Sequence, residues 1–308
     1  MTKNNIAVKK YFPNFTTKVI TFSIDDGSPK YDDMFLDIVR PSGIKGTFNL
    51  YFGLQRYSTN EEYILRYEGY EIANHCNRHP FAINPEKVYS FTEEPFDRET
   101  ADKSLVYRTD REGLFLIWHG RYWATVATRE VYLQLAEEGR RDIDSIFGKG
   151  TVKGFVWPYG AQNDKELHKA LSESGYQYIR KTYTPGFSMP KDRMAWGYNA
   201  SSENLDSKIL EFDALEDDGE LKFFCFGVHS VDFETQGKWD VLRDFVKKYG
   251  NRPNDFWYAG VSEIFEYEDA LNMLEIEGNT VNNLSNKELY VSINSKKLTI
   301  PPKTKISI

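Results

Sequence analysis

Two short polar motifs, each at the end of an apolar run, constrain the fold of this chain more than any other feature. The first run leads to the adjacent carboxylates of Asp25 and Asp26 at a glycine turn. The second leads to His75 and His79, about fifty residues later. Two neutral imidazoles and one carboxylate can hold a divalent ion and leave positions open for water and substrate. The other aspartate is then free to act as a general base, because the glycine turn can bring both carboxylates to one edge.

Each motif also has an ordinary explanation. Asp-Asp-Gly is common in plain turns, and histidine pairs four residues apart are common on exposed faces. His79 precedes Pro80, which disfavours helical geometry, so the motif at 75–79 is expected to be a loop turn rather than a helical pair. The order of the motifs, strand, carboxylates, strand, histidines, favours a metal site over these alternatives.

Strand-like and helical segments alternate along the chain, which predicts a parallel sheet with right-handed crossovers. The expected strands are nearly continuously apolar, as in sheets covered on both faces; they lie at 19–24, 46–52, 70–75, 154–156, 176–183, 221–230 and 256–260. Helices are expected at 31–41, 129–148, 163–175 and 239–250, the third with Asn163 as its cap and Gly175 at its end.

In motif order the chain resembles the polysaccharide deacetylases of carbohydrate esterase family four, which have a chitooligosaccharide-deacetylase homology domain. That family carries TFDDG, H(S/T)xxH, an (R/F)xxPYG-like segment and a late LxH; the counterparts here are SIDDG, HCNRH, GFVWPYG and FGVHS. The ordered resemblance spans about residues 18–230. A subgroup with a late GHSxEF-like segment, a WYA(T/G) strand and a short β tail is matched by FGVHSVDF, FWYAG and the residues after about 280.

The resemblance implies an α/β fold, a distorted (β/α) barrel of about seven parallel strands with functional residues at the carboxyl ends of the strands. It also implies that Asp26, His75 and His79 hold a divalent metal. Zinc is the expected ion, with cobalt, nickel and manganese as alternatives.

The resemblance further implies catalytic roles. Asp25 would be the general base and His229 the general acid that protonates the leaving group. The backbone N–H of Tyr159, which follows Pro158, would face the oxyanion, and Pro158 would contact the substrate. A plain Pro-Tyr-Gly turn is compatible with this role. Asp232 would either orient His229 or be a solvated loop acid.

Three positions depart from the family pattern. The usual arginine of the PYG segment is absent, and Arg180 in YIRKT is the candidate replacement, with an unpaired surface arginine as the alternative. Cys76 stands where the family has Ser or Thr. The stretch after the YIRKT strand reads WGYNAS, in which Trp196 would line the pocket for the acetyl methyl group or lie in the core.

The expected domain organisation is a barrel at 1–275 with a loop insertion at about 80–128, followed by a short β-strand appendage at 276–308 packed on the barrel. The appendage alternates apolar and polar residues, with a turn within 292–298. About 30 residues cannot bury a core alone.

Composition excludes several partners. The 39 basic and 46 acidic residues give a net charge of −7, which argues against a nucleic-acid or anionic-membrane partner. The given N-terminus lacks a signal-peptide pattern and no apolar stretch is long enough to span a membrane, so a cytoplasmic location is expected. The two cysteines imply no disulfide framework. The oligomeric state has no signal in the sequence.

The leading hypothesis is a metal-dependent deacetylase acting on an N-acetyl or O-acetyl group of a sugar or related small molecule. A sugar-binding protein that has lost turnover on the same scaffold is the alternative. A non-haem iron oxygenase also uses two histidines and a carboxylate, but the motif spacing and the late His229 fit it poorly.

Overall fold

The computed structural model describes residues 7–52, 59–84, 86, 90–92, 115–118, 121–123, 126–160 and 164–308. For the strands at 90–92, 115–118 and 121–123 it describes the backbone alone.

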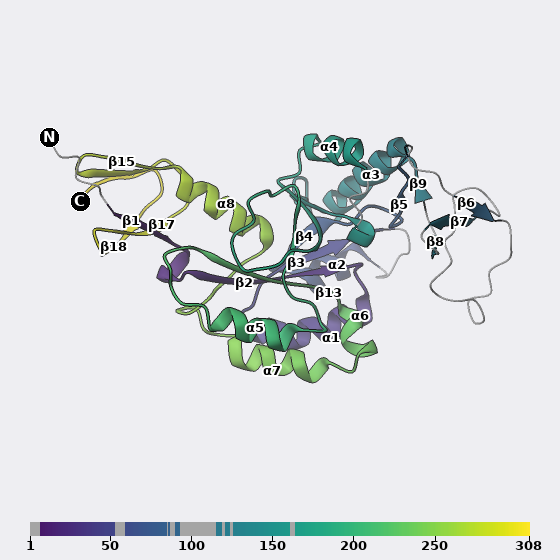
Figure 1. Ribbon diagram of the computed structural model, residues 1–308, viewed down its shortest axis with the longest axis horizontal. Helices are drawn as coiled ribbons and strands as arrows, with labels where there is room; N and C mark the ends of the chain where they lie inside the picture. The colour runs from purple at the N-terminus through teal and green to yellow at the C-terminus, as the bar shows by residue number, and fades with distance from the viewer. Residues whose placement is uncertain are drawn as a thin grey trace.

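Seven parallel strands form a nearly closed barrel at the centre of the molecule (Figure 1). Their order around the barrel is β12-β11-β10-β4-β3-β2-β13. The two ends of this order meet where the N–H of Gly227 donates to the carbonyl of Ala200 at 2.9 Å. The strands are β2 (Lys18–Asp25), β3 (Thr47–Leu50), β4 (Glu71–Asn74), β10 (Gly154–Val156), β11 (Tyr178–Tyr183), β12 (Trp196–Tyr198) and β13 (Lys222–His229). The predicted α/β barrel is therefore confirmed.

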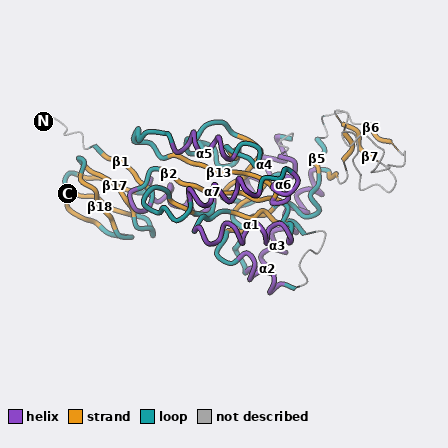
Figure 2. Tube along the Cα trace, turned by 90° about the horizontal axis from the view of Figure 1, so that it is seen from below, coloured by secondary structure: helices purple, strands orange, loops and turns teal. Residues whose placement is uncertain are grey.

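Helices cover the outside of the barrel, with α1, α5 and α7 on one side and α3 and α4 on the other (Figures 1 and 2). The α-helices are α1 (Pro29–Val39), α2 (Asn60–Tyr67), α3 (Arg129–Phe147), α4 (Lys165–Glu173), α5 (Leu205–Asp213), α6 (Ser230–Thr235), α7 (Trp239–Tyr249) and α8 (Val261–Asn272). Short 3-10 turns are η1 (Pro13–Phe15), η2 (Arg40–Ser42) and η3 (Pro158–Gly160). In α7 the buried residues Trp239, Leu242, Phe245 and Tyr249 recur every three or four positions, so one apolar face packs on the barrel.

The cap of α4 differs from the expectation. Asp164, rather than Asn163, caps the helix, and residue 163 lies outside the described ranges. The Asp164 side chain accepts hydrogen bonds from the backbone N–H groups of Glu166 and Leu167, at 3.0 and 3.1 Å. It also pairs with Arg129 at the start of α3. A carboxylate can accept hydrogen bonds from two backbone N–H groups of the helix and pair with a guanidinium at the same time, which explains why Asp rather than Asn caps this helix.

The register of β2 with its neighbours decides which side chains meet at the carboxyl edge. Asp25 lies opposite His229 of β13 and opposite Asn49 of β3. Both neighbouring strands are parallel to β2, so these three residues lie at the carboxyl edge of the barrel, with Asn49 one residue before the end of β3.

Small antiparallel sheets lie beyond the amino ends of the barrel strands, next to both termini (Figure 1). One sheet has the order β1-β17-β18 and the other β15-β16-β19. Their bounds are β1 (Val8–Tyr11), β15 (Leu274–Glu277), β16 (Thr280–Asn283), β17 (Leu289–Ile293), β18 (Lys296–Ile300) and β19 (Lys305–Ser307). The predicted turn falls at Asn294 and Ser295, which have φ of 49° and 68°. The domain boundary at residue 276 stays a prediction.

The remaining strands flank the barrel or belong to the predicted insertion. β14 (Trp257–Tyr258) pairs with the first half of β2. β5 (Phe81–Ala82) pairs with β9 (Val126–Ala127), and β6 (Ser90–Thr92), β7 (Phe115–Trp118) and β8 (Arg121–Trp123) form a separate sheet. Most of the stretch at 80–128 lies outside the described residues.

No helix within the described ranges is long and apolar enough to cross a membrane.

Glu71 ties the amino end of the barrel to α8, and its removal should destabilise the fold. Its carboxylate accepts hydrogen bonds from the Thr47 hydroxyl (2.9 Å), the Tyr178 hydroxyl (3.0 Å) and the Ser262 backbone N–H (2.8 Å). Glu71→Ala leaves these donors without their partner and should lower the free energy of unfolding by about 2 to 4 kcal/mol in urea titrations. The exposed control Glu275→Ala should change it by less than about 0.5 kcal/mol. Equal effects of the two substitutions would contradict this role for Glu71.

Candidate active site

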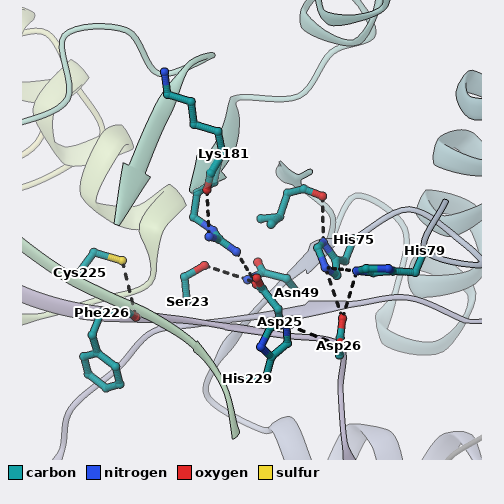
Figure 3. A network of polar contacts seen from close by, with 12 residues as sticks. Ser23, Asp25, Asp26, Asn49, His75, His79, Lys181, Cys225, Phe226 and His229 are labelled. Carbon is teal, nitrogen blue, oxygen red and sulfur yellow. Dashed lines mark hydrogen bonds and ion pairs between the residues drawn. The ribbon is translucent and has the colours of Figure 1, made fainter. Parts of the chain in front are cut away.

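The carboxyl edge of the barrel collects polar side chains from several strands (Figure 3). Asp25 ends β2 and Asp26 follows it, the two histidines follow β4, and His229 ends β13. Figure 3 shows Asp26 pointing toward His75 and His79, whereas Asp25 lies beside Asn49. The sequence motifs, separated by up to about two hundred residues, thus meet at one edge.

Asp26, His75 and His79 form the candidate metal centre. Their ligand atoms all lie within 4.8 Å of one another, and they are the one such group found among the described residues. Asp26 Oδ1 lies 3.4 Å from the Nε2 atom of each histidine, and the two Nε2 atoms are 3.1 Å apart. Asp26 Oδ1 is buried and has no hydrogen-bond partner. A buried carboxylate oxygen without a donor, facing two imidazole nitrogens, fits a divalent cation.

The surroundings prepare both histidines to act as ligands. The Nδ1 of His75 lies 2.9 Å from the carbonyl of Val156, so its Nδ1–H donates there and its Nε2 lone pair faces Asp26. Burial and the neighbouring His75 lower the pKa of His79 to about 4. His79 is therefore neutral at pH 7, as a metal ligand must be.

The backbone at this edge adopts conformations that non-glycine residues rarely take. Asp26, Cys76, His79 and Tyr159 have φ of 77°, 58°, 49° and 59°. The turn after β2 thus begins at Asp26 itself and continues at Gly27, where a Cβ would lie 2.7 Å from Leu50. Such strain is concentrated at functional sites and persists only where the surroundings support it. The loop turn predicted for the histidine motif is confirmed.

Cys76, which stands where the family has Ser or Thr, is well packed. Its side chain is fully buried, and its Sγ lies 3.9 Å from the carbonyl of Tyr132. Its backbone N–H donates to Asn74 Oδ1 at 2.9 Å. The cysteine therefore packs under the histidine turn and keeps a weak polar contact.

Asp25 is held by the barrel interior and separate from the candidate metal centre. Its Oδ1 accepts a hydrogen bond from Asn49 Nδ2 at 2.7 Å. The same oxygen forms an ion pair with Arg180 Nη2. Burial would raise the pKa of Asp25, but the guanidinium of Arg180 outweighs it and holds the pKa below its ordinary value. Asp25 is consequently ionised at neutral pH.

Arg180 is not a surface arginine. Its side chain is 2 % exposed, and its Nη1 donates to the carbonyl of Lys181 at 3.0 Å. The guanidinium also lies over the ring of Tyr198. The structure brings Arg180 to Asp25, as expected of a replacement for the missing motif arginine.

His229 faces both aspartates and is fixed by a neighbour on α6. Its Nε2 lies 3.7 Å from Asp26 Oδ2, and Asp232 Oδ2 accepts from its Nδ1 at 3.1 Å and from its backbone N–H at 2.8 Å. Burial would lower the pKa of His229, but Asp232 and the charges of Asp25 and Asp26 raise it to about 9. Of the two alternatives for Asp232, the structure favours the one that orients His229.

The remaining predicted residues divide between the edge and the core. Pro158 is buried, and the ring of Tyr159 packs on His79 with centroids 4.5 Å apart. Trp196, in contrast, is 2 % exposed and packs against Tyr178 and against Phe265 of α8. It belongs to the core that the barrel strands share with α8 and the small sheets. The geometry thus favours the core alternative for Trp196.

Sequence reasoning missed Asn49 and the carbonyl of Val156. Asn49 is a fully buried polar residue in an apolar strand, directly opposite Asp25 in the register of β3 and β2. A lone amide near the carboxyl end of the predicted strand 46–52 was the available signal. A backbone carbonyl leaves no signal in the sequence.

Comparisons with known proteins agree with this fold. The sequence profile of the polysaccharide deacetylase family matches residues 13–179, more than half of the chain. A structure of a Mycobacterium smegmatis protein assigned to the polysaccharide deacetylases has 16% identity, covers 86% of this chain and 95% of its own, and superposes with a TM-score of 0.53. At this identity the structural similarity supports the fold alone. No curated protein matches the chain in sequence.

Two further solved structures superpose with lower TM-scores. The peptidoglycan deacetylase PdaC from Bacillus subtilis has 15% identity over 83% of this chain and 94% of its own, with a TM-score of 0.46. A family 4 acetyl xylan esterase from Clostridium thermocellum, in complex with a cobalt ion, has 14% identity over 82% and 92%, with a TM-score of 0.45. The family match over residues 13–179, which contains the carboxylate and histidine motifs, shows that this chain belongs to the polysaccharide deacetylase family.

Proposed function

We propose that the protein is a metal-dependent deacetylase that hydrolyses an N-acetyl or O-acetyl group on a carbohydrate or a related small molecule. The observation that carries the proposal is the pair of aspartates with separate environments. Asp26 faces two histidines, whereas Asp25 faces Arg180 and Asn49. One carboxylate is thereby suited to bind a cation and the other to accept a proton.

Asp26, His75 and His79 would hold the divalent ion. One oxygen and two nitrogen donors with open positions suit zinc, and cobalt, nickel and manganese are alternatives. When bound, such an ion lowers the pKa of a coordinated water and polarises a carbonyl. The buried, unpartnered Oδ1 of Asp26 supports this assignment independently of the family.

The residues around this centre would carry the proton transfers. Asp25, kept ionised by Arg180, accepts a proton from the attacking water while the oxygen of that water bonds to the acetyl carbon. His229, protonated at neutral pH, gives its proton to the leaving amine or alkoxide as the carbon–nitrogen or carbon–oxygen bond breaks. The products are acetate and the free amine or alcohol. The backbone N–H of Tyr159, at the same edge, is the proposed donor to the oxyanion.

The Arg180 contact also bears on the alternative of a sugar-binding protein that has lost turnover. Two departures from the family pattern motivate that alternative, the absent motif arginine and the altered WGYNAS stretch. Because Arg180 on β11 reaches Asp25 on β2 from across the barrel, the charge that the family places there is supplied. This supports hydrolysis over binding alone.

Asp25→Asn removes the proposed general base and should lower kcat for acetate release by about 10²- to 10⁴-fold while the metal content stays at that of the wild type. Because this substitution leaves Arg180 buried without its anion, Asp25→Glu serves as a second variant that keeps the charge but displaces the carboxylate. It should also lose most activity. Substantial turnover in both folded variants would refute the role of Asp25.

Metal removal should destabilise the protein as well as inactivate it. Free zinc at a hundred times its dissociation constant should raise the free energy of unfolding of the metal-free protein by about 2.7 kcal/mol. The increase should be seen as a higher Tm. His79→Ala should abolish this shift. The control His168→Ala, on α4, changes a histidine outside the candidate centre and should keep it. A zinc-induced shift that survives in His79→Ala would place the ion elsewhere.

Asp232→Asn should move the alkaline limb of the activity profile. The Asp232 carboxylate stabilises the imidazolium of His229 and raises its pKa, so its loss lowers that pKa. Asn keeps an acceptor for the His229 backbone N–H. The alkaline limb of kcat/KM should shift to lower pH by roughly half a unit to one unit. The exposed control Asp240→Asn should leave the limb in place, and an unshifted limb in Asp232→Asn would argue against His229 as the acid.

A further inference from the structure

A pocket adjoins Asp25 and His229, and its described lining includes none of the three candidate metal ligands. It has a volume of about 360 Å³, within the range of small-molecule sites. Its walls come from β2, β12, β13, α6 and the loop that follows β12. Because it opens directly beside the proposed general acid, it is placed to receive the part of the substrate that leaves with the proton of His229.

The described lining of this pocket is polar and acidic. It contains the carboxylates of Asp25, Asp232 and Glu203, and none of its described residues is Lys or Arg. Asp25 is paired with Arg180, and Asp232 is paired with His229. Within the part of the chain that the structure describes, no Lys, Arg or His forms an ion pair with Glu203. Glu203 thus supplies the negative charge of the pocket that has no cation paired with it.

The loop that carries Glu203 is fixed in place. Lys238 Nζ donates to the carbonyls of Ser202 and Glu203, at 3.1 and 2.8 Å, so its charge serves the backbone of the loop. The backbone N–H of Ser201 donates to Asn204 Oδ1 at 2.8 Å. Ser202 is 3 % exposed. These contacts hold Glu203 at the rim of the pocket rather than leaving it on a free loop.

We propose that this pocket, through the carboxylate of Glu203, selects substrates that carry an ammonium group on the sugar next to the acetylated one. The substrate class is a partly N-acetylated amino-sugar oligomer. The inference rests on the proposed deacetylase function and adds a charge preference to it. Sugars that carry a carboxylate or phosphate at this place are disfavoured, because Glu203 repels them and the one cationic side chain of the described lining, His229, is already paired with Asp232.

The test compares four disaccharides as substrates of the zinc-loaded wild type. They are the fully N-acetylated glucosamine disaccharide, its two mono-N-acetylated forms with the free amine in either position, and an N-acetylated disaccharide with a uronic acid. At low salt and pH 6, one of the free-amine forms should be preferred over the neutral disaccharide by about two- to fivefold in kcat/KM, as expected of a partly exposed charge pair. The uronic acid should be the poorest substrate. High salt should reduce the preference.

Glu203→Gln should bring the ratio between kcat/KM for the free-amine disaccharide and kcat/KM for the neutral disaccharide to about one. Asp206→Asn removes an exposed carboxylate at the start of α5, outside the described pocket lining, and should keep the ratio. The ratio should also fall toward one as the pH rises above about 8, where the substrate amine loses its charge. Titration of the enzyme itself cancels in this ratio.

Dissociation constants for the same sugars, measured by calorimetry, separate the hypothesis of a charge preference from the hypothesis of deacetylase activity. Hydrolysis with no charge preference, or with a preference that survives in Glu203→Gln, would overturn the inference and leave the deacetylase proposal standing. Binding that prefers the ammonium form only when Glu203 is present, without hydrolysis, would support the inference and overturn the proposed function. Absence of both binding and hydrolysis would overturn both.

Discussion

The buried guanidinium of Arg180 requires an anion, because a charge in the interior of a barrel is tolerated only when it is paired. Among the described residues that anion is Asp25, which β2 delivers from across the sheet order. The pair joins β11 to β2, so the position of the proposed base depends on the closure of the barrel. Asn49 and His229 flank Asp25 through strand register. A change in that register would separate all of these groups together.

The two ends of the barrel have different physical tasks. At the amino end, apolar residues from the strands, α8 and the small sheets share one core, which includes Trp196 and Phe265. At the carboxyl edge, buried polar groups and left-handed backbone conformations at Asp26, Cys76 and His79 would each cost free energy in isolation. The stability of the apolar core at the amino end thus offsets the cost of the strained backbone and the unpaired polar groups at the carboxyl edge. A cation and a substrate can provide partners for those polar groups.

Sequence alone predicted the features that have local or ordered signals. Continuous apolar runs identified six of the seven barrel strands, because parallel strands covered on both faces cannot contain many polar residues. The seventh, β12, is three residues long and was not predicted, and the predicted strand at 256–260 is β14, which pairs with β2 outside the seven-strand order. Motif order brought Asp26, His75 and His79 together. Features that depend on long-range geometry could not be predicted in this way. The pairing of β1 with β17 joins the two ends of the chain. The choice of Asp164 as the helix cap depends on its ion pair with Arg129. The core position of Trp196 depends on its packing against α8.

Acetate release tests the central claim most directly. The chelated protein and its zinc-, cobalt- and nickel-loaded forms are compared side by side on a panel of N- and O-acetylated sugars and a generic aryl acetate. The two-aspartate arrangement predicts release that is absent after chelation and restored by at least one metal, with saturation at one ion per chain. One ion bound per chain with no acetate released from any substrate would contradict it, and would favour a binding protein on this scaffold.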